Sequence, residues 1–294
     1  NGKTIDNLLI DGDEFFRGNH QLALENLTAE MIEKIELLKN YQDLSSIKGF
    51  ENNSQIAVNV GLKKSFRDAF KGNLDLESGV KERYKLHSNL FNFGSKNKLN
   101  IITDANNLNE SVFSPFDYIE MRKTTGKNML KDKITIGREV TVEKDIPPFI
   151  FAKDTISSIN TKNNTINFAK KINKNKRIEF ISILNQTKQT ENNTSFQTFF
   201  DYGSSTILDE YASIGTSIFT SNFFKIENKI NEKSYLETNA YFFYSWDKQN
   251  QNLNNLIIDD QETTLFDNKT DLKSTKFGFN TLYKTKFSEK ILFE

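Results

Sequence analysis

The sequence predicts a mainly β protein: a partial antiparallel transmembrane β-barrel wall preceded by a small α/β plug remnant. Three observations favour this fold class. Residues 1–64 mix an apolar strand, a helix-like segment and an alternating strand. The rest of the 294-residue chain alternates apolar and polar residues in segments separated by loops rich in Asn and Lys. Hydrophobic residues make up only 36% of the chain, which suits a barrel wall that is apolar on one face.

The opening part is expected to contain two strands with a helix-like segment between them. An apolar strand, residues 8–10, ends in an Asp-Gly turn formed by Asp11 and Gly12. Residues 31–39 place charges between apolar positions, and their second half is expected to leave the helix for a strand. A broken helical stripe precedes it, with members Leu22, Leu24, Leu27, Ile32 and Ile35. Residues 55–63 alternate as a strand does.

These segments resemble the C-terminal part of the plug domain of TonB-dependent outer-membrane receptors. That family has a strand ending in Asp-Gly, as at Ile10-Asp11-Gly12. Its Ile-Glu-Arg-Ile-Glu-Val-Leu-Lys pattern is similar to Ile32-Glu33-Lys34-Ile35-Glu36-Leu37-Leu38-Lys39, and its Asn-Ile-x-Thr-Lys-like closing strand is similar to residues 58–63. Residues 84–103 also resemble the first barrel hairpin of a branch found in Bacteroidetes-type bacteria.

The resemblance implies a receptor of the Gram-negative outer membrane that takes up a ligand by energised transport. Its partners would be a cargo (siderophore, glycan, peptide or other), a periplasmic energy-coupling protein and outer-membrane lipid. The plug would block a lumen too wide for side chains to fill. Both ends of the chain read as strands, so we expect a longer protein, with the first plug half upstream and more barrel strands downstream.

The chain is expected to divide into the C-terminal part of a plug domain, residues 1–64, and antiparallel strands of an incomplete barrel, residues 65–294. About a dozen strands are expected after the plug. A plugged transporter barrel uses roughly 22 strands of about 9–11 membrane-spanning residues each. The 230 residues after Lys64 include long loops and do not supply that many strands. The chain is therefore expected to be either a fragment of a closed barrel or an open, partial wall.

The clearest strand signals follow residue 70. Turns are expected at 79–82, 94–97 and 229–233, and prolines at 115, 147 and 148 mark an irregular middle with one hairpin at 133–142 and a strand at 146–153. Later strands are expected at 165–170, 177–185, 195–202, 213–228, 234–246, 256–266 and 275–286. In the strand 234–246, one face is apolar, with Leu236, Ala240, Phe242, Tyr244 and Trp246, and the other carries Glu237, Asn239 and Tyr241. This pattern predicts lipid outside and water inside, with Tyr244 and Trp246 in an aromatic girdle.

Composition and spacing argue against the usual chemistries. The charge is balanced, with 39 basic and 39 acidic residues, so no nucleic-acid partner is expected. The chain has no cysteine, and its two histidines, His20 and His87, are far apart. The Asp11, Asp13, Glu14 cluster lacks the spacing of an EF-hand, and no Gly-x-Ser-x-Gly or phosphate loop occurs. We therefore expect no enzyme, catalytic residue, cofactor or metal site.

Four charged residues are the candidates for plug–wall contacts: Glu33, Lys34, Glu36 and Lys39. Hydrated ion pairs are individually weak, which suits a plug that must move. The alternative interpretation is a soluble or surface-attached β-rich binding or structural domain. The outward faces of residues 234–246 and 275–286 distinguish the two, because a sandwich would bury them under a second sheet and a barrel would expose them to lipid.

Overall fold

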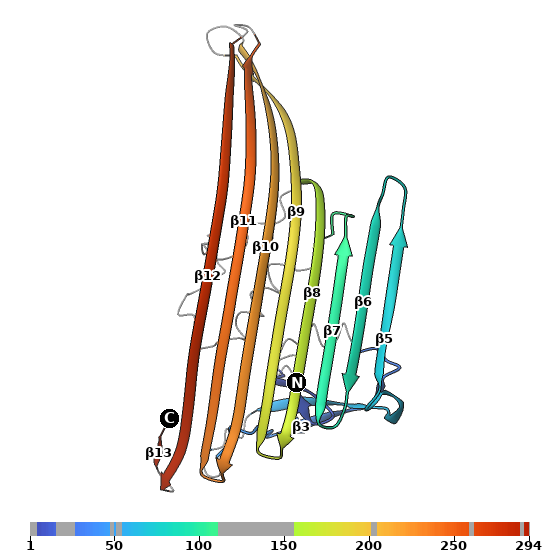
Figure 1. Ribbon diagram of the computed structural model, residues 1–294, viewed down its shortest axis with the longest axis vertical. Coiled ribbons are helices and arrows are strands. Elements are labelled where there is room, and N and C mark those ends of the chain that lie inside the picture. Colours follow the sequence, from blue (N-terminus) through green and yellow to red (C-terminus); the bar gives the residue numbers. More distant parts are fainter. Residues whose placement is uncertain are drawn as a thin grey trace.

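The computed structural model of the chain consists of two β-sheets (Figure 1). The structure describes residues 5–15, 27–47, 50, 55–110, 156–200, 205–258, 262–288 and 291–293. The small sheet, β1–β4, has the strand order β2-β1-β4-β3, and the large sheet, β5–β13, has nine strands in sequence order. Among the described residues, no helix has both the length and the apolar character needed to cross a lipid bilayer.

The small sheet contains one parallel and two antiparallel pairs. Its strands are β1 (Asn7–Ile10), β2 (Asp13–Glu14), β3 (Ile32–Lys39) and β4 (Ile56–Leu62). β1 runs parallel to β4, and β3 pairs with β4 antiparallel. The helix expected over the first half of residues 31–39 is therefore wrong, because Ile32–Lys39 is a strand throughout, whereas the strand expected over the second half is confirmed. The apolar residues at 32, 35 and 38 imitate a helical period, but the neighbouring β4 supplies ladder partners that favour an extended backbone.

The predicted Asp-Gly turn is confirmed as a two-residue hairpin between β1 and β2. Asp11 and Gly12 have φ values of 49° and 81°, as a hairpin turn with two left-handed central residues requires. The side chain of Asp11 accepts hydrogen bonds from the Leu62 amide at 3.1 Å and from Arg67 at 3.0 Å. The turn therefore also ties the end of β4 to the segment that leads into the large sheet.

The large sheet is an antiparallel meander in which every strand pairs with its neighbours in the chain. Its strands are β5 (Phe70–Ser78), β6 (Tyr84–Phe93), β7 (Asn97–Asn106), β8 (Ile156–Asn173), β9 (Lys176–Phe199), β10 (Ser205–Asn231), β11 (Ser234–Ile257), β12 (Glu262–Ser288) and β13 (Ile291–Phe293). A short 3-10 turn, η2 (Lys64–Phe66), precedes them. The turns expected at 79–82 and 94–97 are confirmed, and the turn expected at 229–233 is shorter, because β10 continues to Asn231. The expected hairpin at 133–142 and strand at 146–153 lie outside the described residues. This single-layer meander resembles part of a barrel wall, as the sequence predicts.

The long strands exceed what the sequence pattern indicates. The expected strand 177–185 and residues 195–199 of the expected strand 195–202 belong to β9, which has 24 residues, and β10 and β12 each have 27. The expected strand 256–266 instead spans the end of β11 and the start of β12. Polar, Asn-rich stretches continue as strand because their neighbours supply hydrogen-bond partners. At about 3.4 Å per residue, a 27-residue strand is about 90 Å long, roughly three times the hydrocarbon thickness of a bilayer.

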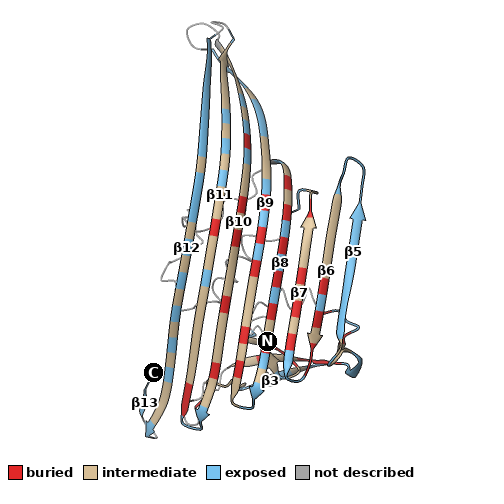
Figure 2. Cartoon of the chain, in the orientation of Figure 1, coloured by how far each residue is buried: buried red, intermediate tan, exposed pale blue. Residues whose placement is uncertain are grey.

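The large sheet has two different faces. We call the face that carries the small sheet the inner face and the opposite face the outer face. Buried residues concentrate on the central strands, whereas the edge strand β5 is exposed along its whole length (Figure 2). The mixed hydrophobic cluster combines both sheets: Leu8, Ile10, Phe15, Leu27, Met31, Val60, Leu62, Phe91, Phe93 and Ala169.

Candidate functional site: two faces and a seated small sheet

A continuous apolar row crosses the outer face of the large sheet. In register, Leu99 of β7 lies opposite Phe168, and the row continues through Phe180, Phe224, Ala240 and Phe279. These side chains share one face because neighbouring residues in register point the same way. On β12, Phe277 and Phe279 are 73% and 63% exposed. The apolar face predicted for residues 234–246 is therefore confirmed, and it faces outward.

The inner face at the same level is largely buried: it is polar on β7 and β8 and turns apolar on β10, where Phe219 and Phe223 are buried. On β8 the buried inner residues are Thr161, Asn163, Thr165, Asn167 and Ala169. Asn100 of β7 lies opposite Asn167 and donates a hydrogen bond to Asn89 at 2.6 Å. Buried polar residues on the inner side of β7 and β8, opposite exposed apolar residues on the outer side, differ from the usual arrangement of a water-soluble sheet.

The small sheet sits on the inner face near the short turns that join β8 to β9 and β10 to β11 (Figure 1). Phe15, which follows β2, packs edge-on against Phe93 of β6, with 5.6 Å between ring centroids. Lys229 of β10 donates a hydrogen bond to the carbonyl oxygen of Ser46 at 2.9 Å. Contacts with β6 and β10 therefore help to hold the small sheet against the large one.

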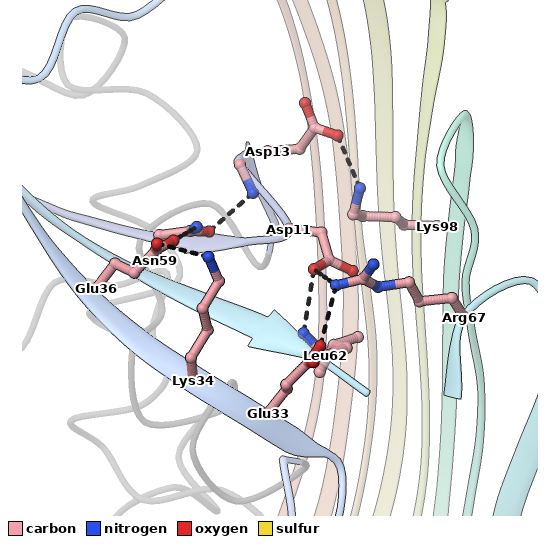
Figure 3. Close-up of polar contacts among 10 residues, drawn as sticks. Asp11, Asp13, Glu33, Lys34, Glu36, Asn59, Leu62, Arg67 and Lys98 are labelled. Atoms are coloured by element: carbon pink, nitrogen blue, oxygen red, sulfur yellow. Dashed lines mark hydrogen bonds and ion pairs between the residues drawn. The ribbon is translucent and has the colours of Figure 1, made fainter. Parts of the chain in front are cut away.

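Asp13 of β2 provides the charged contact between the two sheets (Figure 3). Its carboxylate lies 2.8 Å from the Lys98 ammonium on β7 and 2.6 Å from that of Lys171 on β8. The Lys98 side chain is only 4% exposed. Burial alone would raise the pKa of Asp13, but Lys98 and Lys171 together hold it below its ordinary value. Asp13 is therefore a charged bridge to two strands of the large sheet.

Glu14, the next residue, faces a dense group of charges on the inner face. Burial raises the pKa of Glu14, and the nearby Glu179 raises it further, against the opposing effects of Lys225 and Arg177. Burial, reinforced by Glu14, raises the pKa of Tyr41 to about 12. The small sheet thus brings a carboxyl group with a raised pKa into this part of the interface.

The large sheet contributes a linked set of ion pairs around Glu14. Arg177 and Glu179 of β9 pair at 2.5 Å, and Lys225 of β10 lies 2.9 Å from Glu227. The Tyr235 hydroxyl on β11 lies 2.9 Å from both Glu227 and Glu237, and Lys225 lies 3.4 Å from Glu237. These groups share the inner face at the turn end of three neighbouring strands, where Glu14 adds a fourth carboxyl group.

The four residues predicted from the sequence lie on β3 at the edge of the small sheet. Figure 3 shows three of them, Glu33, Lys34 and Glu36. Lys34 pairs with Glu36 at 2.6 Å within the strand, and Glu36 also accepts a hydrogen bond from Asn59 of β4. Glu33 lies 3.7 Å from Arg67, which follows η2. Lys39 pairs with Ile56 through the β3–β4 ladder. Their role as contacts with the wall of a complete barrel stays a prediction.

The other polar residues noted in the sequence make ion pairs or hydrogen bonds within the chain. Asp11 binds Arg67 and Asp13 binds two lysines, so both aspartates of the acidic cluster pair with cations of the chain itself. His87 lies 2.6 Å from Asp104 across β6 and β7, and His20 lies outside the described residues. Within the described ranges, no group of three or more His, Asp and Glu side chains is arranged to hold a metal ion.

Glu14 leads to a first prediction, on pH dependence. Because its pKa is raised in the folded protein, the folded state binds a proton more tightly than the unfolded state. Attachment of the small sheet should therefore weaken as pH rises from the ordinary carboxyl value of 4.5 through the folded pKa. Glu14→Gln, which keeps the shape and removes the charge, should flatten this dependence. Hydrogen exchange of the β1 and β4 amides across this range measures it, and an unchanged slope in the variant would contradict it.

Comparison with known proteins gives remote similarities only. No family model matches the chain, and no curated protein matches it. Among solved structures, it is similar to the FrpB iron transporter from Neisseria meningitidis, with 7% identity and a TM-score of 0.23 over 96% of this chain and 54% of that chain. It is also similar to the ferric-catecholate import receptor Fiu from E. coli K12, with 11% identity and a TM-score of 0.23 over 96% and 60%. The chain spans a little over half the length of these proteins.

Proposed function

We propose that the chain is part of an outer-membrane receptor that takes up a ligand through a plugged β-barrel by energised transport. The observation that carries this proposal is the pairing of an exposed apolar row on the outer face with an inner face that holds the small sheet. Lipid stabilises such an outer face, whereas water would not. The large sheet acts as the wall and the small sheet as the plug.

The height of the apolar band supports lipid as the outer solvent. On β11 the outward apolar residues extend from Leu236 to Trp246, and Lys248 and Asn250 follow on the same face. Ten residue steps of about 3.3 Å, tilted by about 40°, give a band about 25 Å tall, which matches the apolar band of membrane barrels. Tyr244 and Trp246 lie at its upper limit, where interface aromatics are expected.

Turn length suggests the orientation of the wall. In outer-membrane barrels the periplasmic turns are short. The tight turns between β8 and β9 and between β10 and β11 lie at the end that carries the small sheet. The plug would then face the periplasm, where an energy-coupling protein has access to it. The far ends of the long strands would extend outside the cell.

The edge strands of the large sheet leave backbone hydrogen-bonding groups without a strand partner among the described residues. Among the described strands, β5 pairs only with β6, and β12 pairs on its far side only with the three residues of β13. Unpaired backbone groups in lipid cost several kcal/mol each, so only a closed barrel is stable there. We propose that further strands complete the wall. Glu33, Lys34, Glu36 and Lys39 on the exposed edge of the small sheet are then placed to contact those strands.

The full-length protein tests the proposal. It should remain with the membrane after high-salt washing, dissolve only with detergent, and migrate differently on a gel before and after heating, because closed barrels resist unfolding by cold detergent. An aqueous, detergent-free preparation of the full-length protein would contradict the proposal. It would instead support a soluble or surface-attached β-rich binding domain, a reading favoured by strands that extend far beyond a bilayer.

A further inference from the structure

A small hollow lies on the inner face, farther along the strands than the contacts of the small sheet. Its volume is about 80 Å³, enough for a small chemical group and not for a whole cargo molecule. Six polar residues of four strands carry the argument: Gln189 and Glu191 of β9, Ser217 of β10, Asp247 and Gln249 of β11, and Thr270 of β12. All six lie at inner-face positions of the register.

Gly215 of β10 creates the hollow. It lies opposite Gln189 on one side and Gln249 on the other, so any side chain at this position would project between them. The nearest atom to an added Cβ would be the carbonyl oxygen of Lys248, at 4.0 Å. A larger residue would therefore fit the backbone and fill the space. The absence of a side chain at this point leaves room for a group from elsewhere.

The lining chemistry determines what kind of group fits. Asp247 accepts a hydrogen bond from the Ser217 hydroxyl, and Glu191 adds a second carboxylate. Hydroxyl and amide oxygens supply further acceptors around them. Lys248 alternates to the opposite face, where its side chain is exposed. An anion would face two carboxylates, whereas an ammonium or guanidinium group would find acceptors on several sides.

We infer that this hollow binds a cationic ammonium or guanidinium group of the transported ligand. The inference rests on the proposed function, because it takes the inner face as the path of the cargo. An aromatic and apolar row, in which Tyr211 lies opposite Leu253 and Leu253 opposite Phe266, lies one row beyond the polar residues on the same face. The apolar stem of a cationic group would contact this row while its charged end enters the hollow.

Calorimetric titration of the detergent-solubilised full-length protein with arginine amide tests the inference. Binding is expected, and Asp247→Asn and Gly215→Leu should each weaken it about tenfold or more, the first by removing a charge-assisted hydrogen bond and the second by filling the space. Asp267→Asn, on the outer face of β12, is the matched control and should leave binding unchanged. Citrate should not bind.

Two results would overturn the inference: no binding of arginine amide, or binding that neither Asp247→Asn nor Gly215→Leu weakens. The isosteric Asp247→Asn change keeps the test valid if Gly215→Leu fails to fold. Gel mobility before and after heating separates the two proposals. If the protein is membrane-bound and its gel mobility changes on heating, but arginine amide does not bind, the cation site alone is refuted. If the protein does not associate with membranes, the proposed function is refuted.

Discussion

Asp13→Asn should release the small sheet from the large one. The substitution leaves the Lys98 ammonium, 4% exposed, without its carboxylate partner at 2.8 Å. Removal of one partner from a buried ion pair costs about 3–5 kcal/mol, because the other charge stays desolvated. Hydrogen exchange of the β1 and β4 amides should accelerate by about a hundredfold or more. Exchange in the centre of the large sheet, between β9 and β10, should change much less.

Two variants make this result specific. Glu36→Gln changes another carboxylate of the small sheet that pairs with a lysine, but both partners are exposed, so exchange should stay as in the unmodified chain. Asp13→Asn combined with Lys98→Met removes the stranded charge and should recover part of the loss. Equal effects of Asp13→Asn and Glu36→Gln would rule out the bridge to Lys98 and Lys171 as the main attachment.

The pKa of Asp13 sets an acid limit to the same attachment. Its folded pKa lies below the ordinary 3.8, so its contribution is complete above that value and is lost as pH falls through the folded pKa. The pKa of Glu14 is shifted in the opposite direction, so its contribution to the attachment of the small sheet is lost as pH rises above the ordinary carboxyl value. The small sheet is therefore expected to be held most firmly in a mildly acidic window, between the two transitions.

The strands of the large sheet could be predicted from the sequence because the alternation of apolar and polar residues is a local pattern. Alternation on 234–246 correctly assigned Leu236 and Trp246 to one face and Glu237 to the other. The turn at Asp11 and Gly12 was readable for the same reason, since two adjacent residues determine it. Strand length was not, because the polar middle of β9 is extended only through pairing with β8 and β10.

The contacts between the sheets could not be predicted, because they join distant residues. Asp13 and Lys98 are 85 residues apart, and neither segment contains a pattern that predicts contact with the other. The sequence instead drew attention to the dense charges of β3, which pair locally, as Lys34 does with Glu36. One signal was available: Lys98 stands at an inner-face position of β7 beside Asn100, where a lysine needs a carboxylate partner.

A single charge on the outer face should decide between membrane wall and water-soluble sheet. Phe279 of β12 is 63% exposed and lies in the apolar row beside Ala240. In lipid, Phe279→Arg should cost about 2–4 kcal/mol at mid-bilayer depth. In water, the same change would replace an exposed apolar ring by a charge and raise solubility. The amount of full-length protein recovered from outer membranes, and its heat-dependent gel mobility, measure the difference.

The neighbouring residue provides the control for alternation. Asn280 of β12 lies opposite Asn239 on the inner face, one step along the strand from Phe279. Asn280→Arg places the same charge at the same depth but toward the polar interior, so membrane recovery should stay near that of the unmodified protein. A wall bounded by lipid requires Phe279→Arg to be the more damaging of the two. If Asn280→Arg is instead the more damaging, or Phe279→Arg improves recovery in water, the outer face does not contact lipid.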